Sequence, residues 1–269
     1  LAELAASLTE PIASVCITDQ RETIVAWDRR NSRPLAPAIV WQDRRTAGRC
    51  DALREDGHEP TVRATTGLVL DPYFSASKAQ WLLTEGGVEV TPDLVLGTID
   101  SWVLWNLTGG VDGGELATEP SNASRTMLFD IRALAWSEEL IDLFGIPAAA
   151  LPEVRPSSGR FGRTASGCGL PGGIPVSGMA GDQQAALFGQ ACLEPGMTKN
   201  TYGTGSFVLM HVGASCPEPV DGLLTTVGWT LADGTTAYAL EGAIFVTGAA
   251  VQWLRDGLGV ISDAAEMAT

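Results

Sequence analysis

An aspartate that follows glycines and opens an apolar helix is the strongest candidate for chemistry in this chain. Asp182 lies in the segment GMAGDQQAALFG (178–189), after a short apolar run typical of a buried strand. Backbone approaches ligands closely at such strand–turn–helix junctions. The helix dipole favours an ionised carboxylate there, and that carboxylate could accept a proton near neutral pH. Because a simple helix N-cap has the same pattern, Asp182 alone leaves both interpretations open.

Strands and helices of ordinary length are predicted on both sides of this segment. Hydrophobic periodicity indicates strands at 12–18 and 23–27, flanking a polar turn at 19–22, and helices at 47–55, 77–84, 100–107 and 134–144. The Pro-, Gly- and Ser-rich stretch 152–173 predicts loop with short strands. Hairpins are expected at 199–212 and 223–240, and an apolar helix at about 245–256. This mixture indicates an α/β or α+β protein, with a boundary near the linker Glu194-Pro195-Gly196.

Composition excludes several classes of protein. A chain of 269 residues with 45% hydrophobic and 18% charged residues suits one large or two ordinary globular domains. The net charge of −15 argues against nucleic acid or an anionic membrane as a partner. No apolar run approaches the ~20 residues that span a bilayer. Because no leader pattern of a basic and then an apolar segment is visible, we expect a cytoplasmic protein.

The cysteine and histidine content gives little support for a metal site or a disulfide framework. The five cysteines are scattered without a CxxC pair, and the chain has only two histidines, so no metal site is assigned. Residues 167–172 fit the pattern GxGxxG, but Pro171 and Gly173 are a poor helix start and the segment is predicted to be loop. No GxxxxGK[ST] motif occurs in the chain.

Six segments resemble, in order, those of the FGGY carbohydrate kinase family, and within it the members that phosphorylate glycerol. They are ITDQRET (17–23), AIVWQDRRT (38–46), TGLVLDPYFS (66–75), NASRTMLF (122–129), the Asp182 segment and KNTYGTG (199–205). The resemblance covers nearly the whole chain. It implies an α/β, actin-like ATPase (ribonuclease H-like) fold of two domains. Residues 1–193 would form a nearly complete substrate-binding domain, and 194–269 the start of an ATP-binding domain.

The same resemblance assigns roles to site residues. Asp182 matches the catalytic base that takes the proton from the hydroxyl attacking the γ-phosphate of ATP. The positions that match polyol contacts are Arg21, Glu22, Trp41, Tyr73, Asp182, Gln183 and Phe207. A guanidinium and a carboxylate can together fix adjacent hydroxyls, and aromatic rings can cover the carbon side. Apart from the resemblance, Arg21 and Glu22 read as a solvated ion pair in a turn, and the aromatic residues as ordinary core.

A nucleotide site is implied in the second domain. Gly203, Thr204 and Gly205 match the hairpin that faces the phosphates, where glycines let backbone N–H groups point at oxygens. A plain hairpin turn explains these glycines equally well. Gly248 and Gln252 match positions that line the adenosine pocket, and they lie one helical turn apart. ATP is the implied cofactor, and Mg²⁺ follows from the reaction class rather than from ligands in this chain.

The implied activity is an ATP:glycerol 3-phosphotransferase, which converts glycerol and ATP to sn-glycerol 3-phosphate and ADP. The alternatives are a kinase for another polyol or ketose, and a non-catalytic glycerol-binding regulatory relative. The family's first phosphate hairpin, with its Mg²⁺-associated Asp, and its later glycine-rich adenosine segment have no counterpart between Leu1 and Thr269. We therefore expect weak phosphoryl transfer from this chain alone, and exposed sheet edges that favour pairing or a homo-oligomer.

Overall fold

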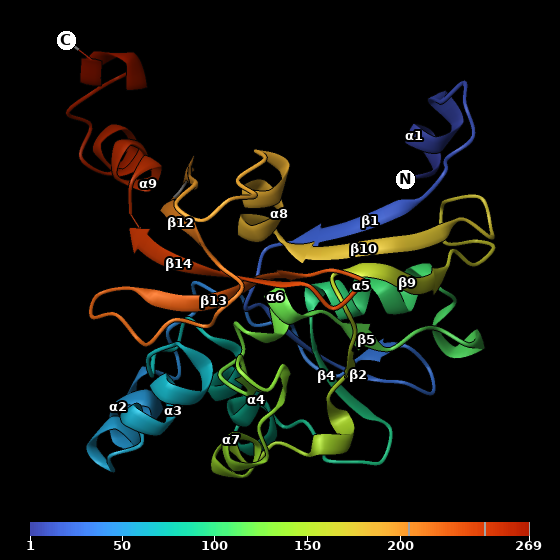
Figure 1. The fold of residues 1–269 in the computed structure, drawn as a ribbon, viewed down its shortest axis with the longest axis horizontal. Helices are drawn as coiled ribbons and strands as arrows, with labels where there is room; N and C mark the ends of the chain where they lie inside the picture. Colours follow the sequence, from blue (N-terminus) through green and yellow to red (C-terminus); the bar gives the residue numbers. More distant parts are fainter. Residues whose placement is uncertain (204, 245, 269) are drawn as a thin grey trace.

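A pair of parallel strands far apart in the sequence forms the centre of the fold. The computed structural model describes residues 1–203, 205–244 and 246–268. Strand β1 (Val15–Asp19) pairs in parallel with β10 (Pro175–Gly181), from Val15 opposite Val176 to Asp19 opposite Gly181. Strand β9 (Ser158–Arg163) joins the other edge of β10 in antiparallel orientation. Helix α5 (Ile99–Leu107) packs along this sheet (Figure 1).

A second, antiparallel sheet follows from the last third of the chain. Its strands are β11 (Thr198–Tyr202), β12 (Ser206–Gly213), β13 (Leu224–Thr230) and β14 (Thr236–Ile244), in the order β11-β12-β14-β13. Both predicted hairpins are confirmed by this pairing. Helix α8 (Asp182–Gly189) contacts both sheets, so the strand β10 and the residues after it connect the two layers (Figure 1).

Smaller strands complete the framework. A third antiparallel sheet has the order β3-β2-β4 and contains β3 (Arg33–Pro34), β2 (Ile24–Asp28) and β4 (Leu94–Thr98). Two short pairs join β5 (Ala117–Thr118) to β8 (Glu153–Val154) and β6 (Phe129–Asp130) to β7 (Ala135–Trp136).

Several helices lie on one side of the four-stranded antiparallel sheet β11-β12-β14-β13. The α-helices not yet named are α1 (Ala2–Ser7), α2 (Ala47–Glu55), α3 (Glu59–Thr66), α4 (Ser75–Thr84), α6 (Pro120–Ala123), α7 (Glu138–Phe144) and α9 (Gly248–Gln252). Single turns of other helix types occur at η1 (Gly110–Asp112), η2 (Ala148–Ala150), η3 (Trp253–Gly257) and η4 (Ala264–Ala268). Figure 1 shows α2, α3, α4 and α7 together below β13, whereas α9 and the C-terminal end project away from the body.

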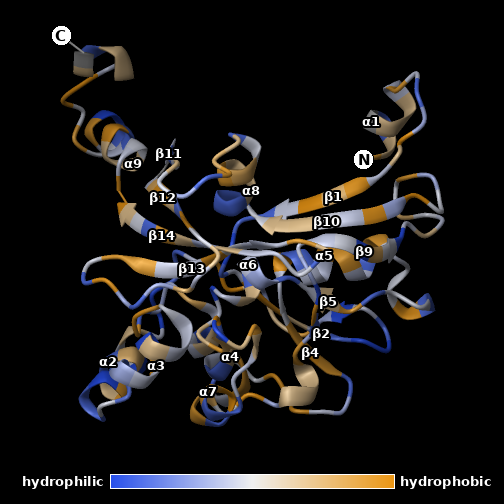
Figure 2. Cartoon of the chain, viewed as in Figure 1, coloured by the Kyte–Doolittle hydropathy of each residue, from blue (hydrophilic) through white to orange (hydrophobic). Residues whose placement is uncertain are grey.

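The main hydrophobic core lies between these helices and the sheets. It includes Phe74, which precedes α4, together with Phe144 of α7, Leu187 of α8 and Leu209 of β12. A separate cluster under β1 and β10 contains Ile17, and Figure 2 colours most of β1 as hydrophobic. Within the described residues, none of the helices combines the length and the apolar composition needed to cross a membrane.

Several sequence expectations need correction. Arg21 and Glu22 do not form a solvated ion pair in a turn, because β1 and β2 belong to different sheets and both side chains are buried, while Gln20 between β1 and Arg21 is exposed. The helix predicted at 134–144 begins only at Glu138. Residues 135–136 pair as β7, and the hydroxyl of Ser137 accepts the N–H of Leu140 as the helix cap.

The helix predicted at about 245–256 is largely confirmed, because α9 continues directly into η3 and the two cover 248–257. Phe245 lies outside the described residues, and Trp253 is 58% exposed rather than packed. An apolar sequence can predict burial, but it does not identify the surface that would cover it.

Candidate active site

The register of the parallel strands brings two distant segments together. Asp19 and Gly181 are opposite each other at the carboxyl ends of β1 and β10. The chain leaves both strands at the same edge of the sheet, the usual position of ligand sites in parallel sheets. The residues that follow, Arg21 on one side and Asp182 on the other, therefore meet, with Arg21 Nε 3.7 Å from Asp182 Oδ1.

Asp182 is the first residue of α8 and faces the pocket. The N-cap position is taken by Gly181, so the simple N-cap interpretation of Asp182 does not hold. Its Oδ1 accepts the backbone N–H of Gln183 at 2.8 Å, and its Oδ2 accepts the Gln183 side-chain amide at 2.9 Å. The Asp182 side chain is 45% exposed. The carboxylate is thus oriented by its neighbour while it remains open to a ligand.

The backbone before Asp182 is fixed from a third element. The hydroxyl of Ser121, in α6, accepts the N–H of Gly181 at 2.9 Å. Ser121 is itself held by Glu119, whose carboxylate caps α6 by accepting the N–H groups of Ser121 and Asn122. Burial raises the pKa of Glu119 to about 7. This buried chain of hydrogen bonds limits how far the Asp182 turn can move.

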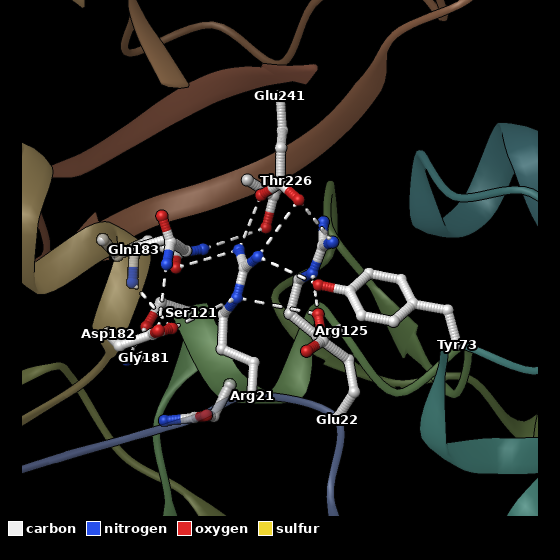
Figure 3. Close-up of polar contacts among 12 residues, drawn as sticks. Arg21, Glu22, Tyr73, Ser121, Arg125, Gly181, Asp182, Gln183, Thr226 and Glu241 are labelled. Carbon is white, nitrogen blue, oxygen red and sulfur yellow. Dashed lines mark hydrogen bonds and ion pairs between the residues drawn. The ribbon is translucent and has the colours of Figure 1, made fainter. Parts of the chain in front are cut away.

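Arg21 is held by its two terminal nitrogens (Figure 3). Nη1 donates to Glu241 Oε2 at 2.6 Å and to Gln184 Oε1 at 3.2 Å. Nη2 donates to Glu241 Oε1 at 3.0 Å and to the hydroxyl of Tyr73 at 3.4 Å. The remaining nitrogen, Nε, lies between Asp182 and Glu22, 3.6 Å from Glu22 Oε1. Arg21 is therefore a rigid, buried donor rather than a mobile surface charge.

One further charge, Arg125, closes a buried ring with Arg21, Glu22 and Glu241. Arg125 donates from Nε to Glu22 Oε1 and from Nη2 to Glu241 Oε1, each at 2.8 Å. All four side chains are at most 2% exposed. Two guanidinium groups and two carboxylates balance to zero charge. Such a buried network is tolerable only because each charge is paired and hydrogen-bonded.

Glu22 adopts an unusual backbone conformation. Its φ of 68° lies in the left-handed region of backbone conformation, which few residues other than glycine and asparagine adopt readily. The carboxylate is accordingly directed to Arg125 and Arg21 while the chain enters β2. A strained backbone at a buried charged residue is typical of functional sites.

The electrostatics of the ring centre on Glu241. Burial alone would raise the pKa of this carboxyl, but the neighbouring guanidinium groups of Arg125 and Arg21 outweigh it and lower the pKa to about 2. Burial also raises the pKa of the Tyr73 phenol, which keeps it neutral. Glu241 is thus ionised at neutral pH while Tyr73 remains a neutral donor and acceptor.

A cavity of about 50 Å³ opens where these groups meet. Its walls include all seven residues expected to contact a polyol, together with Gln20: Arg21, Glu22, Trp41, Tyr73, Asp182, Gln183 and Phe207. One wall is polar and the other aromatic. The ring of Trp41 meets the rings of Tyr73 and Phe207 edge-on, at centroid distances of 5.7 and 6.2 Å. A small ligand with hydroxyls on one side and carbon on the other matches this division.

Two buried lysines support the walls. Lys199 donates to the side-chain oxygen of Gln183, and to Phe207 O at 3.1 Å. Lys78 donates to Tyr73 O at 2.8 Å. Burial lowers the pKa of each ammonium to about 8. Both lysines thus act behind the cavity, on residues that face it.

The described residues among those expected to bind a nucleotide do not line this cavity. The N–H of Gly203 donates to Gly205 O at 2.8 Å, and Gly248 donates to Gly203 O at 3.0 Å, so these three glycines are brought together. In this arrangement the N–H of Gly203 is already occupied. Gln252 lies four positions after Gly248 and is exposed. Thr204 lies outside the described residues.

Sequence reasoning assigned no role to several residues of the site. Arg125 lies within a segment that was compared with the family, and Glu241 directly follows a predicted apolar strand. For Glu241, a charged residue directly after an apolar strand was the only indication in the sequence of a buried ion pair. Lys199 and Gln184 also lie in compared segments, but their roles depend on partners from other parts of the chain.

Comparison with protein families matches two regions of the chain. Residues 3–189 match the N-terminal domain of the FGGY family of carbohydrate kinases, and residues 198–268 match its C-terminal domain.

Individual proteins agree with the family match. A glycerol kinase of Carboxydothermus hydrogenoformans is 55% identical over 261 residues, which are 96% of this chain and 51% of that protein. A glycerol kinase of Halorhodospira halophila is 56% identical over 93% of this chain and 50% of its own length. The structure of Plasmodium falciparum glycerol kinase with ADP superposes with a TM-score of 0.84 at 35% identity, over 95% of this chain and 51% of that one. This chain thus spans about half the length of the curated relatives it matches.

Proposed function

Because this chain belongs to the FGGY family of carbohydrate kinases, we propose that its cavity is the polyol site of an enzyme that phosphorylates glycerol with ATP. The observation that carries the proposal is the gathering of Arg21, Glu22 and Asp182 opposite Trp41 and Phe207 around one small cavity. The similarity to proteins named glycerol kinase at 55% and 56% identity supports the same substrate.

In this proposal the polar wall fixes the hydroxyls of glycerol. The N–H at Arg21 Nε donates to one hydroxyl, and Glu22 accepts from a neighbouring one. Trp41 and Phe207 cover the carbon side and exclude water from it.

Asp182 acts as the general base. The reacting hydroxyl oxygen attacks the γ-phosphorus of ATP, the bond from that phosphorus to the bridging oxygen breaks, and ADP leaves. The hydroxyl proton passes to the Asp182 carboxylate, which Gln183 holds in place. Phosphoryl transfer depends mainly on positioning and charge stabilisation, so one oriented base and a fixed hydroxyl are the main contributions of this wall.

ATP is the proposed phosphate donor, and its contacts are assigned to Gly203, Thr204, Gly205, Gly248 and Gln252. Mg²⁺ enters only as the companion of ATP in this class of reaction. Over the part of the chain that the structure describes, no group of three His, Cys, Asp or Glu side chains is arranged to hold a metal ion. The proposed division into domains is 1–193 for substrate and 194–269 for the beginning of the nucleotide domain.

The test is a substrate panel with the full-length protein. ATP-dependent phosphorylation is measured with glycerol, dihydroxyacetone, xylulose and gluconate, for wild type and for Asp182→Asn. We expect a strong preference for glycerol, and a kcat lower by ~10²–10⁴-fold in the variant. Activity on a larger sugar alone would overturn the assignment of the substrate. A variant rate within a few-fold of wild type would overturn the role of Asp182.

A further inference from the structure

The donors of Arg21 are almost completely used inside the protein. Its two terminal nitrogens carry four N–H groups, and these face Glu241 twice, Gln184 once and Tyr73 once. Nε makes no hydrogen bond to a described residue and lies 3.7 Å from Asp182 and 3.6 Å from Glu22. One N–H is thus left for a ligand, in a defined direction.

The residue that imposes this arrangement comes from another part of the chain. Glu241 lies in β14, 220 positions after Arg21, and is fully buried. Both of its oxygens bind Arg21, and Oε1 also accepts from Arg125. Figure 3 shows it approaching Arg21 from the side opposite Asp182. A bidentate carboxylate fixes the plane of a guanidinium as well as its position.

We propose that Glu241 is a positioning residue that determines the hydroxyl selectivity of the site, by holding Arg21 so that only its Nε N–H faces the substrate. The inference rests on the proposed polyol-binding function and deepens it. Glu241 itself is not among the residues that line the cavity, so it acts through Arg21.

The physical reason is competition for the guanidinium. Asp182 Oδ1 lies close to Arg21 but beyond hydrogen-bond range, whereas Glu241 makes bonds of 2.6 and 3.0 Å. Without the Glu241 charge, Arg21 could turn one of its terminal nitrogens toward Asp182. The site would then present several donors instead of one and would discriminate less sharply between polyols that have or lack a given hydroxyl.

The experiment compares glycerol with propylene glycol, which lacks one hydroxyl, in the full-length protein. The kcat and KM for both are measured for wild type and Glu241→Gln. We expect the variant to raise the KM for glycerol by roughly 10-fold or more, the scale of one lost charge-assisted hydrogen bond. The ratio of kcat/KM between the two substrates should fall by a similar factor. A merely structural role would lower kcat for both substrates alike and leave the ratio unchanged.

Two further variants keep the test decisive. Asp100→Asn also removes a buried carboxylate but has its partners at Thr98 and Thr118, away from Arg21, and should keep the wild-type ratio. Gln184→Met removes one acceptor of Arg21 while the Glu241 pairs remain, and should lower the ratio less than Glu241→Gln does. If Glu241→Gln does not fold, Glu241→Asp retracts the carboxylate from Arg21 by one methylene, and an unchanged ratio in that variant overturns the inference.

The same data separate this inference from the proposed function. A wild-type protein that phosphorylates neither polyol would overturn the proposed function. A wild-type protein that prefers glycerol, with a Glu241→Gln variant of unchanged KM and ratio, would overturn only the role of Glu241.

Discussion

Gly181 and Arg21 are in such close contact that position 181 has no room for a side chain. A Cβ atom on Gly181 would lie 2.6 Å from Arg21 Cγ and 2.7 Å from Arg21 Cδ. Contacts of this length force one of the groups to move. The glycine in front of Asp182 is therefore explained by the arginine stem packed against it, and not only by the geometry of the turn.

Replacement of this glycine should displace Arg21. We expect Gly181→Ala to raise the KM for glycerol by roughly 10-fold or more and to lower the stability by about 1–3 kcal/mol, as overpacking does. Steady-state kinetics and thermal unfolding measure the two effects. The matched control is Gly189→Ala at the other end of α8, where a Cβ would meet no atom within 4 Å. Equal effects of the two substitutions would contradict the steric explanation.

Lys199 should affect substrate binding without touching the substrate. We expect Lys199→Met to leave the Gln183 side-chain oxygen and the Phe207 carbonyl without their donor, at a cost of about 1–3 kcal/mol for a buried acceptor. The KM for glycerol should rise more than kcat falls. Thr201→Val removes a Lys199 partner that does not line the cavity, and its kinetics should stay close to wild type.

At low pH, protonation of Glu241 should weaken the buried ring of ion pairs and lower the stability of the protein. The pKa of this carboxyl is lowered from 4.5 to about 2, so its contribution is present above pH 4.5 and is lost as the pH falls toward 2. The size is about 3 kcal/mol, at about 1.4 kcal/mol per pH unit. Urea unfolding between pH 6 and pH 3, at intervals of about one unit, should show a smaller pH-dependent loss for Glu241→Gln than for wild type. Parallel stability curves would contradict the assignment.

Asp19 should have the opposite pH dependence. Burial, and then the neighbouring carboxylate of Asp100, raise its pKa well above 3.8. A carboxyl with a raised pKa in the folded state favours folding when it is protonated, so its ionisation reduces stability as the pH rises above 3.8.

The Asp19→Asn variant removes this ionisation and keeps the shape of the side chain. We expect the Tm of the variant to exceed that of wild type at pH 8 by more than it does at pH 4. Thermal unfolding at the two pH values measures the difference. A Tm difference that is the same at both pH values would contradict the expectation.

Much of the local structure could be predicted from the sequence. The helix at 47–55 and the hairpins after residue 198 follow from short-range periodicity and glycine turns, and the structure confirms them. Asp182 could be identified as the residue to test because glycines, an apolar strand and an apolar helix surround it within a few positions. Short-range patterns are set by backbone geometry, which neighbouring residues largely determine.

Only the tertiary structure decided the surroundings of Arg21 and Glu22. Their segment is polar, and a polar segment between two strands predicts an exposed turn. In the fold, β1 and β2 enter different sheets, and the turn is closed by Arg125 and by Glu241, which is 220 positions away from Arg21. A charge can be buried only where opposite charges meet it, and those partners are defined by packing rather than by spacing along the chain. The sequence alone therefore indicated which residues to test for the chemistry, whereas the packing of distant strands decided how their charges are held.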